Sequence, residues 1–139
     1  MYNKILVTLE ATPTDRAIIE HVKALASAMK SRVVLLHVAD GWAARTYGSD
    51  AVSPEVTEDR AYLAKVCGEF RDSGIPTEAE LAYGEPAKEI LKWIDRKGCD
   101  LVAMSTHGHR FVGDLLFGTT ARHVRHSARV PVLLLKADK

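Results

Sequence analysis

The stretch STHGHRFVGDLLFGTT, residues 105–120, follows a short apolar run and ends in two hydroxyl residues. Within it, Gly108 and Gly118 are separated by nine residues. Main-chain amides, hydroxyl groups and the amino terminus of a helix together form a site for anions such as phosphate. The stretch therefore predicts an anion-binding connection from a strand to a helix that begins at about Thr119. The spacing alone also fits a plain connector whose glycines supply positive φ.

Outward from this stretch, short apolar runs alternate with helical patterns along the chain. We expect strands at 5–9, 32–38, 77–83, 100–105 and 131–136, and helices that begin near Thr12, Ser53, Gly84 and Thr119. The run VVLLHV is apolar except for His37, which is typical of a strand covered on both faces. This order predicts an α/β fold, a three-layer α/β/α sandwich around a five-stranded, mostly parallel, doubly wound sheet.

Ligands of such sheets bind beyond the carboxyl ends of the strands, where the connections diverge to opposite faces. We expect the first and fourth strands to flank that crevice. The run 77–83 alternates in polarity, and Pro131 precedes the last apolar run, so both strands are predicted at sheet edges. Residues 40–52 show no clear period and are interpreted as an irregular loop.

Length and composition favour one domain over residues 1–139, with a core that needs neither disulfide nor metal. Cys67 and Cys99 lie outside metal-ligand spacings, so we interpret them as reduced packing residues of a cytoplasmic protein. From Asp100 onward, six Lys and Arg stand against three Asp and Glu. This positive segment suits a small anion better than a nucleic acid. No run predicts an export signal or a membrane span.

The sequence resembles the universal stress protein family over nearly its whole length. The resemblance rests on KILVTLE at the start, VVLLHV, GEPAKEI, and STHGHRFVGDLLFGTT followed by RHVRHSARVPVLLLK. Members that bind ATP show glycine, two residues, glycine, nine residues, then glycine followed by Ser or Thr. Here Gly108, Gly118 and Thr119 match that pattern, while Ser105 replaces the first glycine. The resemblance implies a Rossmann-like fold of the adenine nucleotide alpha-hydrolase-like type.

By this resemblance, Gly108, Gly118, Thr119 and Thr120 hold the phosphates of ATP, with Mg²⁺, and the ribose lies near Ser105. The adenine pocket then includes the backbone of Val38 and the first-strand positions Thr8 and Glu10. ATP-binding members usually have aspartate where this chain has Glu10, and often proline where it has Thr8. A glutamate reaches one methylene further and can still accept a hydrogen bond from ribose or adenine.

The remaining polar residues of the stretch extend this predicted site. Arg110 could donate to a terminal phosphate, and His107 beside Gly108 could touch the nucleotide. An H-x-H pair without a third ligand is more typical of a polar loop than of a metal site. The later basic stripe is expected to face water and receives no ligand role; its members are Arg122, Arg125, His126 and Arg129.

The sequence favours a binding protein over an enzyme, because no nucleophile with a base, carboxylate pair or metal site converges. We therefore expect a cytoplasmic stress-response domain that binds ATP and forms a homodimer through the last strand, Val130 to Lys136. ATP would order residues 105–118 and change the surface offered to an unidentified client protein. The alternatives are a nucleotide-independent, chaperone-like dimer and a slow nucleotide hydrolase.

Overall fold

The computed structural model describes the backbone of residues 1–39, 54–106 and 112–137, and their side chains except those of residues 54, 55 and 112–118. The elements in chain order are β1 (Lys4–Thr8), the 3-10 turn η1 (Pro13–Asp15), α1 (Arg16–Met29), β2 (Arg32–Ala39), α3 (Pro54–Asp72), β3 (Thr77–Tyr83), α4 (Pro86–Lys97), β4 (Leu101–Thr106), α5 (Val112–Ser127) and β5 (Val132–Lys136). The loop expected at residues 40–52 lies outside the described residues.

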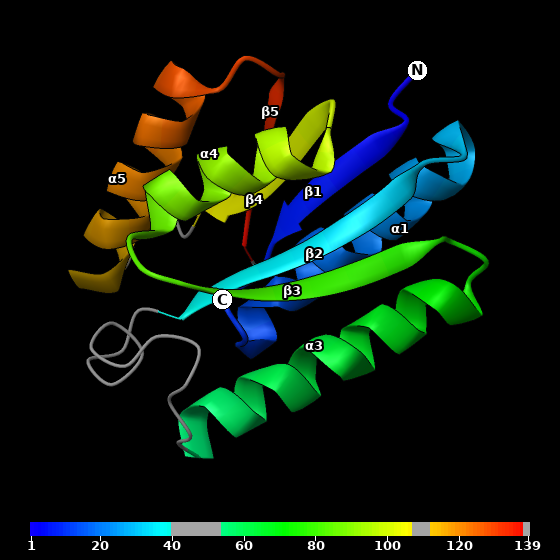
Figure 1. Ribbon diagram of the computed structural model, residues 1–139, viewed down its shortest axis with the longest axis horizontal. Helices are drawn as coiled ribbons and strands as arrows, with labels where there is room; N and C mark the ends of the chain where they lie inside the picture. Colours follow the sequence, from blue (N-terminus) through cyan, green and yellow to red (C-terminus); the bar gives the residue numbers. More distant parts are fainter. Residues whose placement is uncertain (40–53, 107–111, 138–139) are drawn as a thin grey trace.

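The five strands form one sheet in the order β3-β2-β1-β4-β5, and each neighbouring pair is parallel. The predicted five-stranded parallel sheet is therefore confirmed, with β3 and β5 at its edges (Figure 1). β1 pairs with β2 on one side and with β4 on the other. The chain thus changes direction across the sheet between β1 and β4, as the sequence predicts.

Two apolar clusters pack on opposite faces of the sheet. The helices over these faces and the sheet between them make three layers (Figure 1). Side chains of α1 and α3 cover one face, with Ile18 and Phe70 fully buried there. Side chains of α4 and α5 cover the other face, with Ile90 and Val124 in that cluster. β2 contributes to both clusters, which explains its nearly continuous apolar sequence.

Local sequence signals set the ends of α4. Glu85 occupies the N-cap position in an extended conformation, and Pro86 follows at the first helical position, where a missing N–H costs nothing. Gly98 ends the helix with φ +66°, a left-handed conformation that glycine adopts without a Cβ clash. These ends place the first turn of α4 beside the carboxyl end of the sheet.

The start of α5 differs from the prediction. The helix begins at Val112, not at about Thr119, so Thr119 lies within its second turn. In an α-helix only the first four N–H groups lack an intrahelical partner. The amides of Gly118, Thr119 and Thr120 are therefore interior helical amides here. The prediction of a start at Thr119 was wrong because two glycines and a Thr-Thr pair are typical of a loop and a helix cap. The apolar residues before Gly118 are equally compatible with a helix.

Candidate functional site

A cavity of about 320 Å³ lies at the carboxyl end of the sheet, beyond the ends of the neighbouring strands β1 and β4. Its walls come from the ends of β1, β2 and β4, the first turns of α4, and the middle of α5. The lining residues are Thr8, Leu9, Glu10, Leu36, His37, Val38, Glu85, Pro86, Ala87, Ile90, Met104, Ser105, Thr119, Thr120 and His123. Its volume is at the lower end of the range of small-molecule sites.

This cavity brings together six residues that the sequence nominates from four separate segments. They are Thr8, Glu10, Val38, Ser105, Thr119 and Thr120. Gly118 lies on α5 immediately before Thr119. The remaining nominated residues, His107, Gly108 and Arg110, lie outside the described residues.

The inner part of the cavity is apolar. Leu36, Ile90 and Met104 belong to the core cluster under α4 and α5, and Ala87 joins them from the first turn of α4. A flat, weakly polar ring system fits such a lining, because it buries apolar area without leaving many polar groups unpaired. The rim carries the hydroxyls of Thr119 and Thr120 and the imidazole of His123.

Ser105 is buried at 5% exposure, and its hydroxyl has no hydrogen-bond partner among the described residues. Alternation along β4 places its side chain on the same face as Leu101 and Ala103, toward α1 and α3. Its main chain therefore borders the cavity while its hydroxyl projects toward the neighbouring layer. This residue adds little bulk to the cavity itself.

His37 connects the cavity wall to α3. Its Nδ1 donates to the carbonyl of Leu9 at 2.7 Å, since a carbonyl can only accept. Its Nε2 lies 3.3 Å from Oδ2 of Asp59, and both side chains are 13% exposed. Each ring nitrogen of His37, near the end of β2, therefore lies beside an oxygen atom of the protein.

Sequence reasoning missed several residues that line the cavity, among them Ala87, Ile90, Met104 and His123. Ile90 and Met104 carry an ordinary core signal, so nothing in the one-dimensional pattern separates them from other buried residues. The order of the elements offered one usable signal. Because α4 follows the edge strand β3, its first turn begins at the carboxyl end of the sheet, where ligands bind.

Outside the cavity, the exposed face of α5 is basic. A hollow of about 600 Å³ there is lined by Thr119, Arg122, His123, Arg125 and His126, so it shares two residues with the cavity. The side chains of Arg122, Arg125, His126 and Arg129 are exposed, as predicted. Within the described ranges, no three His, Cys, Asp or Glu side chains gather as a metal-binding group. The described helices include none with the length and apolar character of a membrane span.

Comparison with known proteins gives concordant results. The family model described as the universal stress protein family matches residues 1–136. Universal stress protein MJ0577 of Methanocaldococcus jannaschii is 24% identical, with 98% of this chain and 96% of that protein aligned. Universal stress protein C of Escherichia coli is 27% identical, with 96% and 95% aligned.

Solved structures show the same fold. The MJ0577 structure superposes with a TM-score of 0.82 at 26% identity, covering 100% of this chain and 99% of that one. A universal stress protein in complex with cAMP gives 0.75 at 15% identity, covering 97% of each chain. One from Archaeoglobus fulgidus in complex with dAMP gives 0.73 at 20% identity, covering 97% and 98%. With the family model spanning almost the whole sequence, the chain belongs to the universal stress protein family.

Proposed function

We propose that this chain, as a single domain over residues 1–139, binds an adenine nucleotide in the cavity between β1 and β4 and acts as a cytoplasmic regulatory protein of the stress response. One observation carries the proposal. The cavity is lined by six residues that the family resemblance assigns to a nucleotide site, and they come from four separate segments. A binding function fits this lining better than catalysis, because no nucleophile and base converge among the described cavity residues.

The character of the walls supports an adenine nucleoside. The apolar inner wall, formed by Leu36, Ala87 and Ile90, suits the faces of the base. Main-chain groups at Val38 are available to the edge of the base, and the carboxylate of Glu10 can accept from a ribose hydroxyl. The universal stress proteins crystallised with cAMP and dAMP share this fold, so an adenine ligand fits the proposal.

The proposed ligand is ATP with Mg²⁺, its phosphates directed toward α5. Thr119 and Thr120 supply hydroxyls there, and Arg122 adds positive charge nearby. Gly118 enters the proposed site by its position next to Thr119. His107, Gly108 and Arg110 complete the proposed site by sequence position. Mg²⁺ is usually coordinated by the nucleotide phosphates and water, and it needs few protein ligands.

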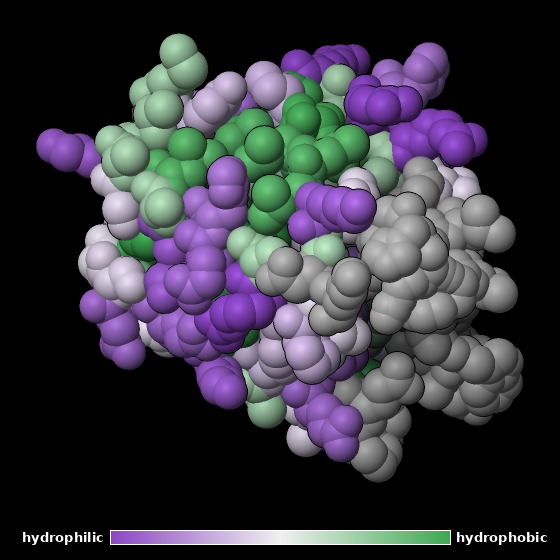
Figure 2. Space-filling view, turned by 180° about the vertical axis from the view of Figure 1, so that it is seen from behind, coloured by the Kyte–Doolittle hydropathy of each residue, from purple (hydrophilic) through white to green (hydrophobic). Residues whose placement is uncertain are grey.

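We further propose a homodimer through Val130 to Lys136. β5 is an edge strand that pairs only with β4 in the described sheet. The side chains of Val132, Leu133, Leu134 and Leu135 are only half-buried. Seen from behind, hydrophobic residues gather on the upper part of the molecule (Figure 2), the part in which β5 lies in Figure 1. An unpaired apolar edge favours pairing with another strand. In this proposal a client protein binds the dimer.

The test begins with native mass spectrometry of the purified protein, which is expected to detect a bound adenine nucleotide. Calorimetric titration with ATP and Mg²⁺ then measures affinity. Gly118→Leu should abolish binding, because a side chain there occupies the path of the phosphates. Gly68→Leu on α3 is the matched control, since a Cβ at Gly68 meets no atom within 4 Å. Equal affinity in the Gly118 variant and the wild type would remove Gly118 from the site.

Hydrogen exchange tests the proposed regulatory step. Saturating ATP is expected to slow exchange in residues 105–118, and unchanged exchange there would disprove ordering by the ligand.

A second candidate is a nucleotide-independent dimer, and the start of α5 favours it. With the helix beginning at Val112, the amides of Gly118 to Thr120 are not free to bind phosphate. Protein that carries no nucleotide and shows no heat on titration, yet elutes as a dimer, would support this candidate instead.

A further inference from the structure

The turn after β1 forms one wall of the cavity and has an unusual backbone. Leu9 and Glu10 line the cavity, and Ala11 follows with φ +64°. A residue with a Cβ rarely adopts this left-handed conformation, so the surrounding structure must hold it. The groups that hold the turn from Leu9 to Ala11 therefore control the position of the Glu10 carboxylate.

Side chains rather than a regular ladder hold most of this turn. The Asp15 carboxylate accepts from the Glu10 amide at 2.9 Å and from the Ala11 amide at 2.9 Å. His37 donates to the Leu9 carbonyl at 2.7 Å. The remaining bond is the Leu9 amide to the Leu36 carbonyl at 2.8 Å. Two side chains, Asp15 and His37, thus fix three of these four main-chain groups.

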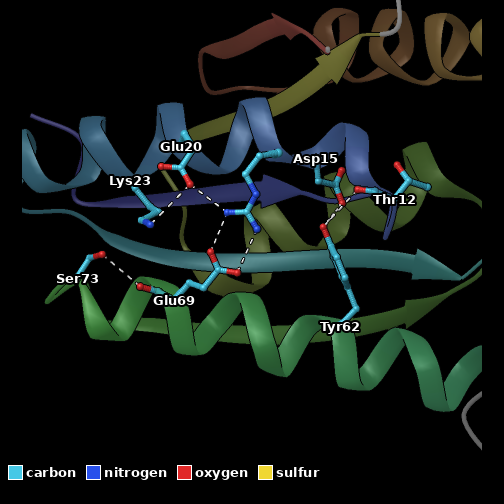
Figure 3. Close-up of polar contacts among 8 residues, drawn as sticks. Thr12, Asp15, Glu20, Lys23, Tyr62, Glu69 and Ser73 are labelled. Carbon is cyan, nitrogen blue, oxygen red and sulfur yellow. Dashed lines mark hydrogen bonds and ion pairs between the residues drawn. The ribbon is translucent and has the colours of Figure 1, made fainter. Parts of the chain in front are cut away.

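Both of these side chains have an outer partner on α3. The Tyr62 hydroxyl donates to Asp15 at 2.8 Å, and Figure 3 shows Tyr62 reaching from α3 toward Asp15. Asp59 pairs with His37 at 3.3 Å. Asp59 and Tyr62 are three residues apart, so they lie on the same side of the helix. Neither residue lines the cavity.

The Asp15 end of this arrangement is closed to water. Asp15 is 1% exposed, and a buried carboxylate is stable only when its oxygens are hydrogen-bonded. Burial, followed by the bond to Asp15, raises the pKa of Tyr62 well above its usual value, so the phenol stays a donor. A phenol that stays protonated keeps Asp15 oriented toward the Glu10 and Ala11 amides.

We propose that Asp59 and Tyr62 of α3 are positioning residues of the cavity: through His37 and Asp15 they set the geometry of the Leu9 to Ala11 turn, and with it the affinity for ligand. The ligand class rests on the adenine-nucleotide function proposed above. Because coupling between two sites is reciprocal, ligand in the cavity also stabilises the first half of α3.

The first test needs no ligand. In ¹H–¹⁵N spectra, Tyr62→Phe should shift the Glu10 and Ala11 amide resonances, because Asp15 loses a donor. Tyr83→Phe is the matched control. It removes a hydroxyl of β3 that accepts a hydrogen bond from Arg60 of α3 at an exposed position. This variant should leave the Glu10 and Ala11 resonances unchanged. Unshifted Glu10 and Ala11 amides in Tyr62→Phe would overturn the proposal.

The second test measures affinity for ATP with Mg²⁺. Tyr62→Phe and Asp59→Asn should each weaken binding about threefold to tenfold, the size expected for the loss of one ordinary polar contact. Glu69→Gln is the structural control. It weakens the ion pair between Glu69 of α3 and Arg16 of α1, whose atoms lie 2.8 Å apart. It leaves the Leu9 to Ala11 turn intact. It should lower the melting temperature and preserve the affinity.

The outcomes separate the two proposals. A wild type without affinity for any adenine nucleotide refutes the proposed function, while the amide shifts still decide the positioning role. A wild type that binds, with unchanged affinity in Tyr62→Phe and Asp59→Asn, refutes the positioning role alone. If Glu69→Gln weakens binding as much as Tyr62→Phe does, general loosening of α3 replaces positioning as the explanation.

Discussion

An aspartate fixes each end of β1, and the two aspartates work in different surroundings. At the amino end, Asp100 accepts from the amides of Asn3 and Lys4 at 2.9 and 3.0 Å. At the carboxyl end, Asp15 accepts from the amides of Glu10 and Ala11. Asp100 is only partly buried, whereas Asp15 is 1% exposed and takes a third donor from Tyr62. The same kind of interaction therefore stabilises the start of β1 at one end of the sheet and the wall of a cavity at the other.

The charged groups of the amino end satisfy one another. Lys97 pairs with Glu78 at 2.6 Å and with Glu80 at 3.0 Å, and Lys4 donates to the Lys97 carbonyl at 3.0 Å. A hollow of about 340 Å³ lies there too, but the Glu78 and Lys4 that line it are already engaged. At the carboxyl end, by contrast, residues from five segments surround an apolar-walled space. Polar groups at the amino end therefore support the fold, whereas those at the carboxyl end border a space that can hold a ligand.

The largest effect should separate the two aspartates. Asp15→Ala leaves two amides and a phenol without their acceptor in a buried place, so it should cost about 3 kcal/mol of unfolding free energy. Asp100→Ala exposes its two amides to water and should cost about 1 kcal/mol. Urea unfolding measures both losses.

Nucleotide titration completes this comparison. Affinity should fall in Asp15→Ala and remain at the wild-type value in Asp100→Ala. Equal losses of stability and affinity in the two variants would mean that the two ends do not differ in role.

A smaller effect appears in acid. Burial alone would raise the pKa of Asp100, but the hydrogen bonds from the amides of Asn3, Lys4 and Asp100 itself, with the amino-terminal charge, together bring the pKa below its usual value. The hydrogen bond from Lys97 lowers the pKa of Glu78. A carboxylate whose folded pKa is depressed stabilises the protein at neutral pH and loses that contribution as pH falls through the folded value. Stability should therefore fall below about pH 4.

The double variant Asp100→Asn with Glu78→Gln checks the source of this acid dependence. It should flatten the fall in unfolding free energy between about pH 5 and pH 3, measured by urea unfolding at each pH. An unchanged slope would assign the acid sensitivity to other carboxylates.

The smallest effect concerns Ser105. Because its buried hydroxyl has no partner among the described residues, Ser105→Ala should leave stability unchanged or raise it by up to about 1 kcal/mol. Thermal unfolding of the ligand-free protein measures this change. A clear loss of stability would show that the hydroxyl bonds to a group of the folded protein. A loss of nucleotide affinity alone would show that it bonds to the ligand.

Much of this fold could be predicted from the sequence, because local signals and burial agree. The apolar run of β2 indicates a strand covered on both faces, and Pro86 with Gly98 marks both ends of α4. The start of α5 could not be predicted, since the glycines of residues 105–120 are compatible with a loop and with a helix. Six nominated site residues meet at one cavity because parallel strands bring their carboxyl ends to one edge.

By itself the sequence determined the alternation of strands and helices, because side-chain polarity along the chain has periods of two and about 3.6 residues. Its resemblance to the universal stress protein family supplied four of the five segments that line the cavity. Only the tertiary structure decided that Ile90 and Met104 line the cavity, and that Tyr62 and Asp59 of α3 hold the turn after β1. Such contacts join residues distant in sequence, and their distances are set by packing between layers, which no local pattern records.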